Sequence, residues 1–200
     1  MNLFIDTTSN LKIGILDSNC HWVHFENLDV KKPSEVIHKI IYDSLENKKL
    51  KIADIKKILT CAGPGSYTGM RLSEGIVQVL ELNGSKACTF FHFEIPLLQG
   101  VENYIWVATA FKGEYFIYHY DNGVIQKHLK VLNELPQFLQ QFSHLKKYSL
   151  TEDVNLGSEF IPTSKLIVDN PEKYLPEVLR REHREPAYYY RTVEEEFKIK

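Results

Sequence analysis

Apolar positions follow two different spacings along the chain, and each spacing predicts a different element. Short apolar runs, separated by turn-forming residues, predict strands at 2–6, 12–16, 21–28 and 58–62. Apolar side chains three and four positions apart predict an amphipathic helix over 31–47, and an apolar stretch without proline predicts another over 70–83. The first part of the chain is therefore predicted as βββαβα.

The second half of the chain repeats this plan in a shorter form. Strands are predicted at 87–91, 104–111, 114–120, 124–131 and 148–150, and helices at 95–103, 135–142 and 171–181. The turns Lys112-Gly113 and Asp121-Asn122-Gly123 are of hairpin type. Two such units predict a duplicated α/β fold, with a first lobe at 1–86 and a smaller, trimmed second lobe with the tail at 87–200.

A glycine-rich elbow joins the fourth strand to the second long helix. Gly63, Gly65 and Gly69 allow backbone conformations closed to other residues, and Ser66 or Thr68 can cap the helix through its hydroxyl. Free amides at such a turn can bind a phosphate, but a tight structural turn is the alternative interpretation. The chain lacks GxxxxGK[ST], which argues against a Walker-type site.

The elbow and its flanks carry a resemblance to a known family. GPGSYTGMRLSEG resembles the GPGSFTGxRxG signature of the TsaB (YeaZ) family, whose members are needed to make threonylcarbamoyladenosine in tRNA. The matching residues are Gly63, Pro64, Gly65, Ser66, Thr68, Gly69 and Arg71. LFIDTTSNLKIGILD is similar to the family's opening strand and turn. EPAYYYR resembles its PxYLR tail at Pro186 and Tyr188, with one extra residue before Arg191.

The resemblance implies a fold, a function and partners. The fold is the duplicated actin-like ATPase (ASKHA) fold. The function is that of a non-catalytic scaffold that binds TsaD in a heterodimer, for threonylcarbamoyl transfer to the adenosine adjacent to the anticodon in tRNAs reading ANN codons. TsaE is the implied third component, and the chain is expected to contact tRNA only as part of the complex. Without TsaD, the surface that binds TsaD can form a homodimer.

The helices at 31–47 and 70–83 are the implied partner interface. Apolar residues occupy most of the circumference of the second helix. One apolar face can pack on the sheet of its own lobe, and a second apolar face must be buried against something else. The first helix can supply that cover, or both can present an apolar ridge to TsaD. The expected interface residues are Val36, Ile37, Ile40, Ile41, Met70, Val77 and Leu80, with Arg71 at the rim.

The parts of a nucleotide site are incomplete. Asp6 is a candidate Mg²⁺ carboxylate, although Asp followed by two threonines also predicts an Asx turn. Thr109 stands where an acidic residue is wanted, and Gly157 is the only glycine after Gly123. We therefore expect a degenerate site with no catalytic residue, no metal and no tightly bound cofactor, with ATP or ADP bound only in a complex. An independent actin-like ATPase or small-molecule kinase is the alternative.

Composition limits the kinds of partner and the cellular compartment that we expect for the chain. The net charge of -2 is unlike that of a protein that grips tRNA alone, and the basic cluster at 180–184 is interpreted as a solvated helix end. The cysteines, Cys20, Cys61 and Cys88, are odd in number and far apart, which argues against a disulfide framework. No leader or membrane span is recognised, so we expect a cytoplasmic protein.

Overall fold

The computed structural model describes residues 1–190, which divide into two compact units. The first unit contains residues 1–91 and 170–187, and the second contains residues 92–169 together with 188–190. This division differs from the expected boundary at residue 86. The strand at 86–90 pairs with the first sheet, and a C-terminal segment returns to the first unit.

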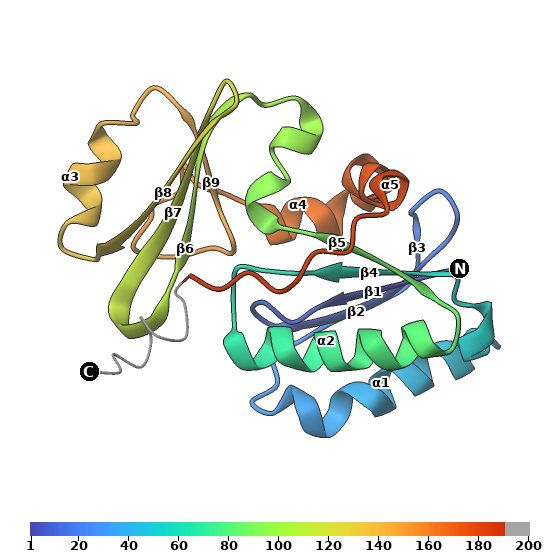
Figure 1. Cartoon of the computed structure of the whole chain (residues 1–200). Helices are drawn as coiled ribbons and strands as arrows, with labels where there is room; N and C mark the ends of the chain where they lie inside the picture. Colours follow the sequence, from blue (N-terminus) through green and yellow to red (C-terminus); the bar gives the residue numbers. More distant parts are fainter. Residues whose placement is uncertain (191–200) are drawn as a thin grey trace. The chain divides into compact units, whose positions relative to one another are not determined.

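A five-stranded mixed sheet forms the centre of the first unit, with strand order β3-β2-β1-β4-β5 (Figure 1). Its strands are β1 (Asn2–Asp6), β2 (Leu11–Leu16), β3 (Trp22–Leu28), β4 (Lys57–Cys61) and β5 (Lys86–Phe90). The first three strands pair antiparallel as a meander, whereas β4 runs parallel to β1 and β5 runs parallel to β4. The predicted antiparallel meander is confirmed.

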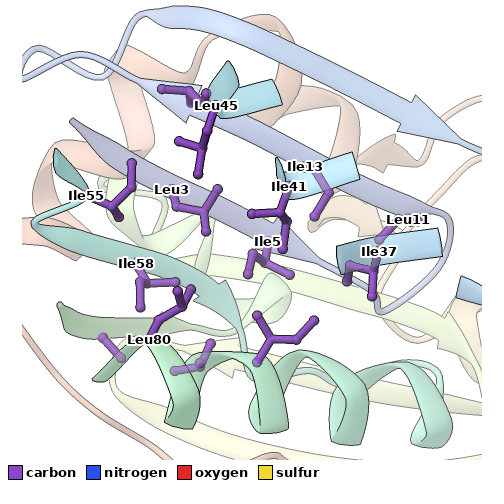
Figure 2. Packing of buried hydrophobic residues seen from close by; sticks show 14 residues of the cluster. Leu3, Ile5, Leu11, Ile13, Ile37, Ile41, Leu45, Ile55, Ile58 and Leu80 are labelled. Atoms are coloured by element: carbon purple, nitrogen blue, oxygen red, sulfur yellow. The ribbon is translucent and has the colours of Figure 1, made fainter. Parts of the chain in front are cut away.

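Helices α1 (Pro33–Asn47) and α2 (Tyr67–Leu82) cover one face of this sheet. Helix α1 begins at a proline, whose fixed φ suits the first helical turn, and α2 begins three residues earlier than predicted because Ser66 caps it. Figure 2 shows their apolar residues meeting those of the strands, including Leu3, Ile5 and Ile58. Each fully buried side chain of this size contributes about 1.5–3 kcal/mol to folding.

The opposite face of the first sheet is covered by α5 (Pro171–Arg181), which contacts β4 and β5. After α5, the backbone follows the edge of β5. The Thr89 amide donates to the His183 carbonyl at 2.8 Å, and the Glu185 amide donates to the Thr89 hydroxyl at 2.7 Å. Residues 182–187 therefore cover an edge that would otherwise present open backbone groups.

Ion pairs fasten this C-terminal segment to α2. The Arg184 guanidinium donates to Glu74 at 2.7 Å and to Glu81 at 3.2 Å, which raises the pKa of Arg184 and lowers the pKa of Glu74. Arg180 and Arg181 both contact Glu177. The three arginines of the basic cluster are thus paired within the chain, which agrees with a solvated helix end.

The second unit repeats the first sheet's pairing pattern. Its strand order is β10-β9-β6-β7-β8, in which β6, β7 and β8 form the antiparallel meander and β9 and β10 run parallel to β6. The strands are β6 (Asn103–Thr109), β7 (Glu114–Asp121), β8 (Val124–Val131), β9 (Lys146–Ser149) and β10 (Ile161–Pro162). The shared order confirms the predicted duplication.

The second unit is also shortened, as predicted. Helix α3 (Leu135–Gln140) has 6 residues where α1 has 15, and turns occupy the stretch between β9 and β10 where the first unit has α2. Helix α4 (Thr163–Asp169), which the periodicity did not reveal, follows β10. The predicted helix at 95–103 is instead 3-10 turns at His92–Glu94 and Leu97–Gln99, ended by Gly100 with φ 70°. Further 3-10 turns lie at Ile52–Asp54 and Phe111–Gly113.

Two further observations concern the cysteines and the helices of the described residues. Cys20, Cys61 and Cys88 are all buried free thiols, in agreement with the expected absence of a disulfide framework. Among residues 1–190, no helix combines the length and the apolar character that a bilayer crossing needs.

We predict that acidification destabilises the second unit through His128. Burial against Phe138, with Lys130 nearby, lowers the pKa of this imidazole from its ordinary value of 6.5, so the folded state resists protonation more than the unfolded state. The stability that the neutral His128 imidazole contributes to the second unit is therefore complete above pH 6.5. It declines as the pH falls from 6.5 to the pKa of His128 in the folded state. Hydrogen exchange of peptides spanning 124–142 should accelerate between pH 7.5 and 5.5, after correction for intrinsic rates.

The matched variants are His128→Phe, which keeps a ring against Phe138, and His21→Phe at an exposed position. His128→Phe should shrink the acid-dependent acceleration, and His21→Phe should leave it unchanged. An undiminished acid response in His128→Phe would show that another group controls it.

Candidate functional site

The glycine elbow between β4 and α2 packs on the turn between β1 and β2. The Ser66 amide donates to the Thr8 carbonyl at 2.8 Å, and the Thr7 hydroxyl donates to the Ser73 hydroxyl on α2 at 3.1 Å. The opening strand-turn and the glycine signature, which are far apart in sequence, therefore meet in one contact.

Two glycines of the elbow are required by close approach. A Cβ at Gly69 would lie 2.1 Å from the Thr7 carbonyl oxygen, and a Cβ at Gly65 would lie 2.5 Å from that of Thr8. Both distances are far inside van der Waals contact, and the obstructing atoms belong to backbone that cannot rotate away. Gly65 and Gly69 thus let the start of α2 rest directly on the β1–β2 turn.

Several polar groups of the elbow already have partners. Ser66 caps α2 by accepting from the Gly69 amide at 3.2 Å, which confirms one of the two predicted caps, and the Gly63 amide donates to the Cys61 sulfur at 3.4 Å. Together with Ser66, whose amide binds Thr8, three of the elbow's amides are engaged. These three amides are therefore unavailable to a phosphate, which needs free donors.

Asp6 is held by neighbours at both carboxylate oxygens. Oδ1 accepts from the Thr8 amide at 2.9 Å and from the Thr8 hydroxyl at 2.6 Å, which confirms the predicted Asx turn. Oδ2 accepts from the Lys12 ammonium at 3.2 Å, and both side chains are buried. A cation at Asp6 would lie close to the buried Lys12 ammonium, and repulsion between the two positive charges would disfavour its binding.

The other matched positions have diverse surroundings. Pro64 is buried, whereas Thr68 and Arg71 are exposed, and the Arg71 guanidinium lies 4.0 Å above the Tyr67 ring. In the second unit, the Thr109 carbonyl accepts from the Tyr190 hydroxyl at 3.2 Å. Arg191, the last residue of the tail resemblance, lies outside the described residues.

The expected interface residues lie mostly in the first unit's own core. Five are buried there: Ile37, Ile41, Met70, Val77 and Leu80. Val36 and Ile40 are partly buried and pack against the same apolar cluster, and only Arg71 is exposed. At these positions the structure favours core packing. A charge at Val77, which is 0 % exposed, would test stability rather than partner binding.

A different set of apolar residues is open to solvent on the same two helices. Tyr42 on α1 is 61 % exposed, and Val79 and Leu82 on α2 are 58 % and 88 % exposed. Tyr42 and Val79 line an apolar groove of about 810 Å³ formed by α1, α2 and residues 49–52, with Leu45, Ile76 and Leu80 also lining it. This groove and its apolar margin are the candidate docking surface.

The exposed apolar residues lie on the two helices that the sequence patterns indicated, but they are not the residues that were predicted. A helix with apolar residues around most of its circumference does not reveal which side faces the sheet, because the sheet's position is not encoded in the helix. The spacing of the apolar residues was the signal that could have identified the exposed ones. Val79 and Leu82 depart from the 70, 73, 77 and 80 spacing of the buried face, which follows the helical repeat.

Comparisons with known proteins agree with the architecture. No protein-family model matches the sequence, and no curated protein matches it. The solved structure of the ethanolamine utilization protein EutJ from Carboxydothermus hydrogenoformans matches with a TM-score of 0.51 at 12% identity, over 86% of this chain and 88% of that one. YeaZ from Pseudomonas aeruginosa matches with a TM-score of 0.49 at 19% identity, over 65% of this chain and 67% of that one.

The chain has the duplicated actin-like ATPase fold. The EutJ likeness and the repeated sheet order support this fold and, at such low identity, carry no information about function. The predicted fold class is confirmed.

We predict that Gly69→Ala destabilises the first unit, whereas Gly75→Ala on the same helix stabilises it. The first substitution forces a methyl group against the Thr7 carbonyl, and the second places one in open space. An exposed helical glycine replaced by alanine gains up to about 1 kcal/mol, while overpacking costs about 1–3 kcal/mol. Urea unfolding measures both, and equal behaviour of the two variants would contradict the close approach.

Proposed function

We propose that the chain is a non-catalytic scaffold subunit of the TsaB type. It binds and activates a TsaD-type protein, which transfers a threonylcarbamoyl group to the adenosine adjacent to the anticodon in tRNAs reading ANN codons. The observation that carries the proposal is the solvent-exposed apolar groove on α1 and α2, on the helix that follows the TsaB-like signature.

The docking surface supports a protein partner. Tyr42, Val79 and Leu82 are large apolar or aromatic side chains in water on neighbouring helices of one unit. Contiguous apolar surface of this kind usually marks an interaction site, and a stable interface buries roughly 1,600 Å² in total around a few central anchors. Tyr42 and Val79, which flank the groove, are our anchors for TsaD.

The non-catalytic part of the proposal is supported by the first unit's polar groups. The Asp6 carboxylate is neutralised by Lys12 and bound by Thr8, and the elbow amides of Gly63, Ser66 and Gly69 are engaged within the chain. These groups hold the fold together. In this proposal the chain contacts TsaE and tRNA only as part of the complex with TsaD, and ATP or ADP binds only to that complex.

We predict that Val79→Asp weakens binding to TsaD from the same organism at least tenfold. A carboxylate in the apolar centre of an interface is desolvated without a partner. The matched control is Val124→Asp in the second unit, because Val124 is 59 % exposed and Val79 is 58 % exposed. Size-exclusion chromatography with light scattering, followed by titration calorimetry, measures complex formation, and circular dichroism verifies that both variants fold.

Equal affinities for Val79→Asp and Val124→Asp would place the interface elsewhere. A mixture of wild-type chain and TsaD that elutes as two unchanged species, with and without TsaE and ATP, would contradict the scaffold proposal itself.

We also predict that the isolated chain gives no saturable heat with Mg²⁺-ATP in calorimetry. The physical reason is the Lys12 ammonium beside Asp6, whose positive charge already balances the carboxylate and disfavours a cation there. Saturable, Mg²⁺-dependent binding that Asp6→Asn abolishes would instead support the independent ATPase or kinase.

A further inference from the structure

Strand β8 is an open edge of the second sheet. Within the described residues it pairs only with β7, and its register with β7 runs without a bulge from Val124 to Val131. The other edges of the two sheets are less open: residues 182–187 cover β5, β10 has 2 residues, and β3 carries none of the large apolar side chains that are exposed in residues 1–190. A long, regular edge with open backbone groups is a template for another strand.

The outward backbone groups of β8 come from its odd-numbered residues. Asn122 and Gly123, with φ of 46° and 90°, form the two-residue turn between β7 and β8. The pair that closes this turn, Asp121 and Val124, is the hydrogen-bonded kind, and bonding alternates along an antiparallel ladder. Even-numbered residues of β8 therefore bond to β7, and odd-numbered ones direct their amide and carbonyl groups to the open edge.

The exposed apolar side chains of this edge lie at the two ends of the strand. Val124 and Ile125 are 59 % and 51 % exposed at its start. At its end, Val131 and the next residue, Leu132, are 39 % and 45 % exposed. The middle of the strand is polar, with Lys127 exposed. This apolar-polar-apolar order is the same from either end, so the strand is complementary to itself when it is read antiparallel.

Symmetry restricts how two copies of β8 can pair. A two-fold axis normal to the sheet makes the strands antiparallel and keeps every side chain on its own face, so odd-numbered residues lie opposite odd-numbered ones. A parallel arrangement would place each lysine beside its own copy, and an axis at Lys127 would place the two Lys127 side chains opposite each other. Like charges that are directly opposed destabilise a strand pair. An axis at His128 avoids this repulsion.

The register centred on His128 also matches the ends of the strand. Every opposed pair then joins one residue to a residue of the other copy. The pairs are Val124 with Leu132, Ile125 with Val131, Gln126 with Lys130, Lys127 with Leu129, and His128 with itself. The exposed apolar side chains cover one another, and no two lysines are directly opposed. Burial lowers the pKa of His128 from 6.5, so both imidazoles at the axis are neutral at pH 7.

We propose that two copies of the chain associate through β8 as an antiparallel strand pair with its two-fold axis at His128, so that their second-unit sheets become continuous. Lysines on an edge strand usually discourage pairing. Here they select the register, and the Lys127 ammonium lies 4.6 Å above the Tyr188 ring of its own chain. The pairing uses no residue of α1 or α2, so it is independent of the proposed scaffold function, and one dimer carries two docking surfaces.

Sedimentation equilibrium of the full chain measures the association directly. The wild-type chain should show a reversible monomer-dimer equilibrium. Ile125→Asp should weaken the dimer about tenfold, because a carboxylate then faces Val131 of the other copy in two symmetric pairs. The matched control is Phe111→Asp, because Phe111 is an exposed apolar residue of the second unit outside β8, 58 % exposed against 51 % for Ile125. The control should dimerise like wild type.

Charge rescue tests the register. Val131→Lys alone should also weaken the dimer, because an ammonium then faces Ile125 of the other copy. The double variant Ile125→Asp/Val131→Lys should recover it, because the introduced carboxylate and ammonium of the two copies are then opposed. The two positions of one chain are six residues apart on the strand, roughly 20 Å, so the recovery cannot come from within one chain. Circular dichroism verifies that all variants fold.

Four outcomes would overturn the proposal. The first is a wild-type chain that stays monomeric at submillimolar concentration, and the second is equal dimerisation of Ile125→Asp and Phe111→Asp. The third is a double variant as weak as the single ones, which would exclude the axis at His128. The fourth is a dimer that Val79→Asp dissociates and Ile125→Asp leaves intact, which would assign self-association to α1 and α2.

The affinity of Ile125→Asp for TsaD separates this proposal from the scaffold function. Calorimetry should give the wild-type affinity, because the substitution lies outside the docking surface. Val124→Asp lies on the same edge and should also weaken the dimer while leaving the affinity for TsaD unchanged. Loss of TsaD binding by the wild-type chain would contradict the scaffold proposal and leave the strand pairing intact.

Discussion

The contact on which the first unit depends is the close approach of α2 to the β1–β2 turn. With a side chain at Gly69, the helix start would be displaced from the Thr7 carbonyl, and the hydrogen bond from Ser66 to Thr8 would be stretched. Because α2 is a rigid rod, such a displacement at its first turn would move the whole helix. The position of Val79 on the far half of α2, and hence one side of the groove, follows from this approach.

The same contact explains why polar residues typical of a nucleotide site have a structural role here. Asp6 binds Thr8 and so shapes the turn that receives the elbow, while Lys12 balances its charge. A buried ion pair adds little net stability, but loss of either partner leaves an uncompensated charge. The arrangement therefore favours keeping Asp6 as a fixed element of the fold.

Sequence patterns predicted local elements well and long-range placement poorly. The strands of both meanders and helix α1 follow from periodicity and turn residues, since these are properties of neighbouring residues. The assignment of β5 to the first sheet could not be derived in this way, because its partner β4 lies on the far side of a helix in sequence. For the same reason, a charged or apolar residue such as Arg184 or Val77 gave no indication of which element it would contact.

The two units differ in the length of the helices that accompany their sheets. Both sheets have the same strand order. Each unit therefore has two positions for a helix: one between the meander and the first parallel strand after it, and one between that strand and the next. Only the first unit fills both positions with long helices; in the second, α3 is short and turns replace the other helix. Among the described residues, a surface formed by two long neighbouring helices therefore exists in the first unit alone.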